Sequence, residues 1–85
     1  MITTYTVNIW GETYSIRADW AHASSPVESQ GDDGFWIPTG RLVADYHAPE
    51  DAMADYLRII AAFGGNDPTE CQAEIDAAVA AMFEG

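Results

Sequence analysis

The chain lacks lysine altogether, and three arginines and two histidines face 14 acidic residues, so the formal net charge is −11. Proteins bind nucleic-acid backbones and anionic membranes mainly through Lys and Arg side chains that neutralise phosphates. The composition therefore argues against direct binding to nucleic acid and against binding to an anionic membrane surface.

Cysteine and long apolar runs are also scarce. The single cysteine, Cys71, cannot form an internal disulfide, although small secreted domains usually depend on such cross-links. The sequence does not open with the basic and apolar segments of a signal peptide, and no apolar stretch is long enough to span a bilayer. These features favour a cytoplasmic protein.

Apolar material is sufficient for a folded protein. Hydrophobic residues make up 48% of the chain and aromatic residues 12%, which is more than an acidic disordered tail contains. The 85 residues suffice for one small domain and not for two, so we expect residues 1–85 to form a single domain. Because such a small domain has a limited core, a homodimer is also expected to be possible.

The first half of the chain predicts antiparallel strands. Residues 3–10 and 12–19 alternate between apolar and polar side chains, and Gly11-Glu12 between them suits a type II′ turn. That turn pairs Ile9 with Tyr14, Val7 with Ile16, and Tyr5 with Ala18. We expect a polar loop over 21–34, then one broken strand or a second hairpin over 35–46 with a turn at Thr39-Gly40.

The second half predicts two helices. Apolar spacing after Pro49 indicates a helix that ends at Gly64-Gly65. Asp67 and Pro68 then supply the N-cap and first position of a second helix, whose apolar side ends at Met82. The predicted fold is α+β: an antiparallel sheet of three to four strands with two C-terminal helices packed on one face.

Negative charge is concentrated in the helical half. Residues 45–85 hold nine acids and one arginine, whereas residues 1–44 hold five acids and two arginines. Asp51 with Asp55, and Glu70 with Glu74, are i, i+4 neighbours about 5–6 Å apart, a spacing close to that of phosphates along a nucleic-acid strand. Acids on a solvated helix also promote solubility, but solubility does not require that lysine be absent.

No motif in the sequence points to catalysis. His22 and His47 lie in separate predicted loops and lack the spacing of paired metal ligands. We therefore expect no enzymatic activity, no catalytic residue, no metal and no cofactor.

A small lysine-free acidic domain with a Tyr5–Asp19 hairpin and acidic helices from Glu50 and Glu70 resembles the small anti-CRISPR proteins of phages. The run from Asp45-Tyr46 to Glu50-Asp51 also resembles the opening of an anti-restriction DNA-mimic module. The resemblance implies an inhibitor in the host-cell cytoplasm that occupies the nucleic-acid-binding surface of a CRISPR effector complex. The residues expected to contact this partner are Asp32, Asp33, Asp45, Glu50, Asp51, Asp55, Glu70 and Glu74, with Trp36 and Tyr46 as apolar anchors.

The alternative hypothesis is a non-enzymatic interaction or dimerisation module. Trp10, Trp20 and Trp36 fall at predicted strand ends, and exposed aromatic side chains dominate many protein interfaces. Binding through these aromatics would depend weakly on salt, whereas acidic mimicry would depend on it strongly.

Overall fold

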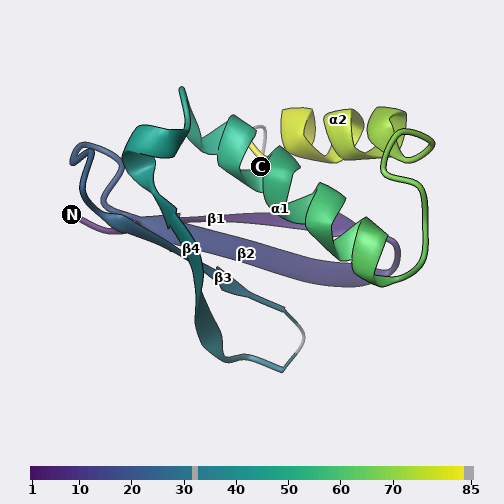
Figure 1. Cartoon of the computed structure of the whole chain (residues 1–85), viewed down its shortest axis with the longest axis horizontal. Helices are drawn as coiled ribbons and strands as arrows, with labels where there is room; N and C mark the ends of the chain where they lie inside the picture. Colours follow the sequence, from purple (N-terminus) through teal and green to yellow (C-terminus); the bar gives the residue numbers. More distant parts are fainter. Residues whose placement is uncertain (32, 84–85) are drawn as a thin grey trace.

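The computed structural model describes residues 1–31 and 33–83 as a four-stranded antiparallel sheet with two helices on one face (Figure 1). The strands follow one another in the order β1-β2-β3-β4. The elements are β1 (Thr3–Ile9), β2 (Glu12–Ala18), β3 (Pro26–Gln30), β4 (Trp36–Leu42), the short 3-10 helix η1 (Val43–Asp45), α1 (Pro49–Phe63) and α2 (Gln72–Ala81). This arrangement confirms the predicted α+β fold.

The β1–β2 hairpin is present, but its turn and pairing differ from the prediction. Trp10 and Gly11 form the turn with φ angles of 55° and 76°, as a type I′ turn requires. The observed pairs are Ile9 with Glu12, Val7 with Tyr14, Tyr5 with Ile16, and Thr3 with Ala18. The predicted turn at Gly11-Glu12 is therefore wrong, and so is its register. A shift of two residues keeps every side chain on the same face, so alternation alone could not distinguish the two registers.

A strand lies inside the segment predicted to be a loop. β3 pairs with β2 and buries Val27 and Ser29, which are 2% and 8% exposed. The prediction missed it because Val27 is its single apolar residue and Pro26 begins it. β4 is one continuous strand rather than a hairpin, and Thr39-Gly40 lies within it. The β3–β4 register shifts beside Gly40, whose φ is 82°, so this glycine marks an irregularity in the strand rather than a turn.

The first helix follows the sequence pattern closely, whereas the second begins later than predicted. α1 has Ala48 as its N-cap and Pro49 in its first turn, as expected. Asp67 caps the turn that precedes α2, because its Oδ1 accepts a hydrogen bond of 2.9 Å from the Thr69 N–H. Regular helix begins only at Gln72, five residues after the predicted N-cap.

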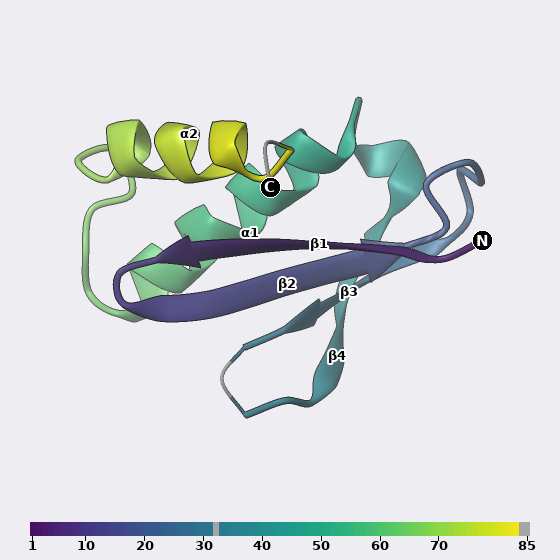
Figure 2. The same cartoon turned by 180° about the vertical axis from the view of Figure 1, so that it is seen from behind.

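The core lies between the sheet and the helical layer. α2 packs over β1 and α1 over β2, while the β3–β4 hairpin extends beyond both helices (Figures 1 and 2). The fully buried side chains include Ile16 and Val27 from the sheet and Met53, Leu57 and Ile75 from the helices. Each such side chain contributes about 1.5–3 kcal/mol through burial, so the helical layer is held mainly by apolar packing.

Candidate partner-binding surface

The helical side of the molecule carries most of the negative charge. From the start of α1 to the end of α2 there are seven carboxylates and one arginine, Arg58. The carboxylates belong to Glu50, Asp51, Asp55, Asp67, Glu70, Glu74 and Asp76, and all are exposed or half-buried. The outer face of the sheet is different: its charged residues Arg17 and Glu28 form an ion pair with an N···O distance of 3.0 Å. The two broad faces therefore differ sharply in net charge.

Three of the predicted contact acids meet where the chain enters α1. Asp45, Asp51 and Asp55 line a hollow of about 430 Å³. Its other lining residues are Arg41, Tyr46, His47 and Arg58. This surface is therefore negative but includes two of the three arginines, which the sequence pattern did not place here.

Two of these acids also hold the local structure. Asp45 accepts a 2.8 Å hydrogen bond from the Leu42 N–H, and Asp55 accepts one of 2.7 Å from the Tyr46 hydroxyl. Burial raises the pKa of Tyr46 far above its ordinary value, and the bond to Asp55 raises it further, so the hydroxyl stays protonated as a donor. Within the described residues, no ion pair or hydrogen bond engages the Asp51 carboxylate, which is exposed.

The helical hairpin adds an acid from α2 to this region. Glu50 and Asp51 share a shallow hollow of about 400 Å³ between the helices with Arg58 and Asp76. Arg58 Nε donates to Gln72 Oε1 at 3.0 Å, and Gln72 Nε2 donates to Asp76 Oδ1 at 2.7 Å. Asp76 was not among the predicted contacts, because only the tertiary packing of α1 against α2 brings it to Asp51. We call Asp45, Glu50, Asp51, Asp55 and Asp76 the acidic surface.

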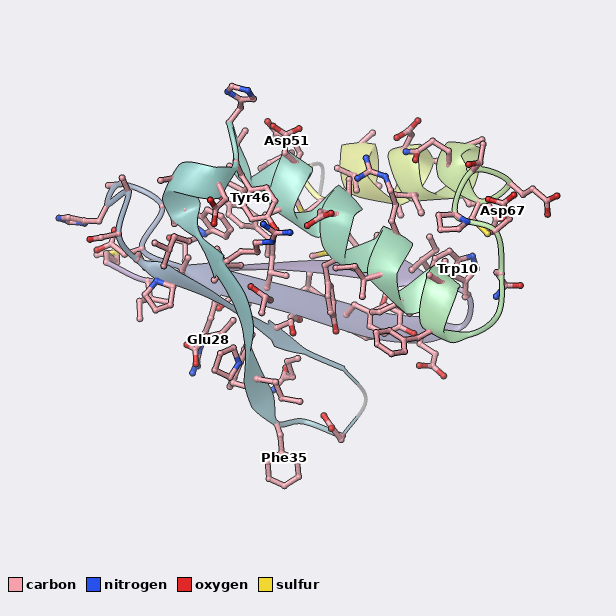
Figure 3. The ribbon with its side chains drawn as sticks, viewed as in Figure 1. Trp10, Glu28, Phe35, Tyr46, Asp51 and Asp67 are labelled. Carbon is pink, nitrogen blue, oxygen red and sulfur yellow. The ribbon has the colours of Figure 1, made fainter. Side chains whose placement is uncertain are left out.

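The remaining predicted acids lie elsewhere. Glu74, on α2, accepts a 3.1 Å hydrogen bond from Trp10 Nε1, and Figure 3 shows Trp10 and Asp67 at the opposite end of the helical layer from Asp51. Glu70 lies just before α2, three residues after Asp67.

The β3–β4 hairpin holds the other predicted acids. Asp33 accepts a 3.1 Å hydrogen bond from the Phe35 N–H, and Figure 3 shows Phe35 at the tip of this hairpin, away from both helices. Asp32 lies outside the described residues. The predicted acids therefore do not form one continuous patch.

The two predicted aromatic anchors occupy different faces. Trp36 lies on the outer face of the sheet, where the Arg17 guanidinium carbon stands 4.1 Å from its ring centroid. Tyr46 lines both the hollow beside the acidic surface and an adjoining apolar groove of about 290 Å³ between β4 and α1. The groove includes Ile59 and Phe63, which are 46% and 88% exposed. The apolar spacing of the first helix gave no sign that these two side chains would be exposed.

The histidines stand apart from each other. His22 Nδ1 lies 2.8 Å from Asp19 Oδ2, which also contacts the amino group of Met1 at 3.1 Å. Hydrogen bonds from His22 and from that amino group lower the pKa of Asp19 to about 2. His47 lines the hollow at the start of α1. Among the described residues, no three His, Cys, Asp or Glu side chains gather in a way that could hold a metal ion.

Comparison with protein-family models, with curated proteins and with solved structures gives no match. In the part of the chain that the structure describes, neither helix has the length and apolar character needed to cross a membrane.

Proposed function

We propose that the protein is a non-enzymatic inhibitor that binds the basic nucleic-acid-binding surface of another protein, as acidic anti-CRISPR proteins do. A CRISPR effector complex is the proposed class of target. The observation that carries the proposal is the excess of carboxylates on the helical layer: it holds seven against the single Arg58, and none of the ion pairs among the described residues engages any of the seven.

The acidic surface would act in two ways. Its field would attract a positively charged partner from a distance, which raises the rate of association. On contact, Lys and Arg side chains that otherwise hold phosphates would pair with the carboxylates and relieve the repulsion between them. Both effects weaken as salt screens the charges, so affinity should fall steeply with ionic strength.

The apolar groove would supply the part of the affinity that salt does not weaken. It adjoins the hollow at the start of α1, with which it shares Arg41, Tyr46 and Asp55. An apolar side chain of the partner that entered the groove would cover Ile59 and Phe63, and buried apolar anchors commonly dominate interface energetics.

The test uses purified CRISPR effector complexes and their labelled nucleic-acid targets in a mobility-shift assay. Asp51→Asn with Asp55→Asn raises the net charge by two within the acidic surface. Thr13→Lys with Ser24→Lys raises it by the same amount on exposed residues outside the helical layer. We expect the first pair to weaken inhibition about tenfold or more and the second to leave it nearly unchanged. Equal losses, or no inhibition of any effector by the unaltered chain, would contradict the proposal.

The alternative is an interaction or dimerisation module that binds a protein partner through the aromatics of its sheet. The exposure of Trp10, which is 37% at the β1–β2 turn, favours it. It predicts that Trp36→Ala weakens binding more than the Asp51 and Asp55 substitutions do, and that affinity changes little with salt.

A further inference from the structure

The two edges of the sheet differ in how far they discourage pairing with another strand. β4, at one edge, contains Pro38, an irregularity at Gly40 and the charge of Arg41. Proline, bulges and edge charges are the usual devices that prevent edge-to-edge association. β1, at the other edge, reads Thr-Thr-Tyr-Thr-Val-Asn-Ile and contains none of them. The open edge of β1 is therefore competent to pair with a further strand.

The hairpin turn determines which backbone groups of β1 are free. A two-residue type I′ turn closes on a hydrogen-bonded pair, here Ile9 with Glu12, and such pairs recur at every second residue. Thr3, Tyr5 and Val7 therefore use their N–H and C=O groups toward β2. Thr4, Thr6 and Asn8 direct theirs to the open edge.

No charged side chain lines the hollow beside this edge. A hollow of about 490 Å³ runs along it, lined by the residues Thr4, Tyr5, Thr6, Val7, Asn8, Ala78, Ala81 and Met82. None of these side chains is charged, although the whole chain carries −11. A basic segment would find no carboxylate among them, so the strand that fits is an uncharged one with alternating apolar side chains. β1 of a second copy is such a strand. The small side chains Ala78 and Ala81 leave room beside the edge for the α2 of that copy.

We propose that the chain forms a homodimer in which β1 pairs antiparallel with β1 of a second copy about a two-fold axis at Thr6. Thr6 then pairs with its own equivalent and Thr4 with Asn8, which uses the outward backbone groups of all three residues. Tyr5 faces Val7 of the other copy on the helical side, so the new apolar contacts continue those of the core. A two-fold axis perpendicular to the sheet keeps both helical layers on the same side, and Figure 2 shows that β1 borders this layer.

Charge sets the salt dependence of this dimer. Two copies with a charge of −11 each repel one another, and added salt screens that repulsion. The dimer should therefore tighten as salt rises, whereas inhibition through the acidic surface should weaken. The dimer does not rest on the proposed function, and the opposite salt responses make the failure of one proposal distinguishable from that of the other.

Sedimentation equilibrium of the whole chain at increasing concentration and salt provides the test, with Thr6→Lys and Thr13→Lys as a matched pair. Each substitution adds one charge on the outer face and removes one 2.8 Å side-chain hydrogen bond between β1 and β2, Thr6 to Ser15 or Thr13 to Asn8. Only Thr6→Lys places two like charges directly opposite each other in the dimer. We expect the unaltered chain and Thr13→Lys to dimerise and Thr6→Lys to dimerise about tenfold more weakly or worse.

Cross-linking gives a second measurement that does not depend on affinity. Directly opposed, hydrogen-bonded residues of antiparallel strands have Cα atoms about 5.5 Å apart, which lies within the range of a disulfide. Thr6→Cys should therefore form a covalent dimer on oxidation, and Thr13→Cys should not exceed the background from Cys71, which both variants retain. A chain that stays monomeric at every concentration and salt, equal dimerisation of the two lysine variants, or equal cross-linking of the two cysteine variants would overturn the proposal.

Discussion

The outer face of the sheet and the helical side are both polar surfaces, yet they handle charge differently. On the outer face, Arg17 is paired with Glu28 and stacked on Trp36, so its charge is compensated locally. On the helical side, some carboxylates accept hydrogen bonds from neutral donors, as Asp55 does from Tyr46. Others, such as Asp51, form no hydrogen bond or ion pair with any described residue. Since both surfaces would keep the protein in solution, solubility does not account for the difference. A surface whose charge is left uncompensated in the free protein is the one suited to a charged partner.

Loss of the apolar packing that holds the helical layer in place should disturb the acidic side of the molecule most. Ile75 is fully buried where α2 meets the core. Ile75→Ala should lower the free energy of unfolding by about 2–5 kcal/mol, because it leaves a cavity beneath α2. Urea denaturation followed by circular dichroism measures the change. A decrease in the free energy of unfolding below about 1 kcal/mol would show that α2 is not stably packed on the core.

A second variant separates the contribution of the helical side to affinity from its contribution to stability. Phe63 is 88% exposed at the end of α1, so Phe63→Ser should leave the unfolding free energy within about 0.5 kcal/mol. If the groove holds an apolar group of the partner, the same change should weaken inhibition about tenfold, which is close to 1.4 kcal/mol. Isothermal titration calorimetry against the inhibited complex measures the loss. Unchanged affinity would remove the groove from the binding surface.

A substitution on the outer face of the sheet should lower stability without changing inhibition. Trp36→Ala removes the stacking partner of Arg17 and should cost about 1 kcal/mol of stability at this half-buried site. It should leave inhibition unchanged, because Trp36 lies on the face away from the helical layer. A large loss of inhibition in a variant that remains folded would place the binding surface on the sheet instead.

The smallest expected effect concerns pH. Asp19 has its pKa lowered from 3.8 to about 2 in the folded chain, mainly by the hydrogen bond from His22 and then by the one from the amino terminus. A carboxyl whose pKa is lower in the folded state stabilises the fold above its unfolded pKa, and that contribution is lost as pH falls toward the folded value. Stability should therefore decline between about pH 4 and pH 2, and Asp19→Asn should make the decline shallower. Thermal melts measure the melting temperature of both chains across this pH range. If the melting temperature changes equally with pH in the two chains, Asp19 contributes nothing to the decline.

The fold was largely predictable because its strongest signals are local. Pro49 and the acids after it mark the start of α1, and Gly64-Gly65 marks its end. Prediction failed where a local rule had two solutions. Gly11 can occupy either central position of a hairpin turn, and the observed turn places Trp10 at a positive φ, which a large side chain rarely adopts. β3 was missed because a strand with one apolar residue has no alternation to detect.

The candidate site was less predictable, because it depends on tertiary packing. Spacing along a helix placed Asp51 and Asp55 together correctly. It gave no sign that Asp76 would join them, or that Arg41 and Arg58 would line the same hollow, since these contacts require the helical hairpin and the path of β4.

The salt dependence of affinity for an inhibited nucleic-acid-binding complex distinguishes binding through the acidic surface from binding through apolar groups. It is measured for the unaltered chain and for the variant with Asp51→Asn and Asp55→Asn. We expect the affinity of the unaltered chain to fall steeply as salt rises from about 0.05 to about 0.5 M, and the affinity of the variant to fall less steeply. Equal slopes, or an affinity that salt does not change, would contradict binding through the acidic surface.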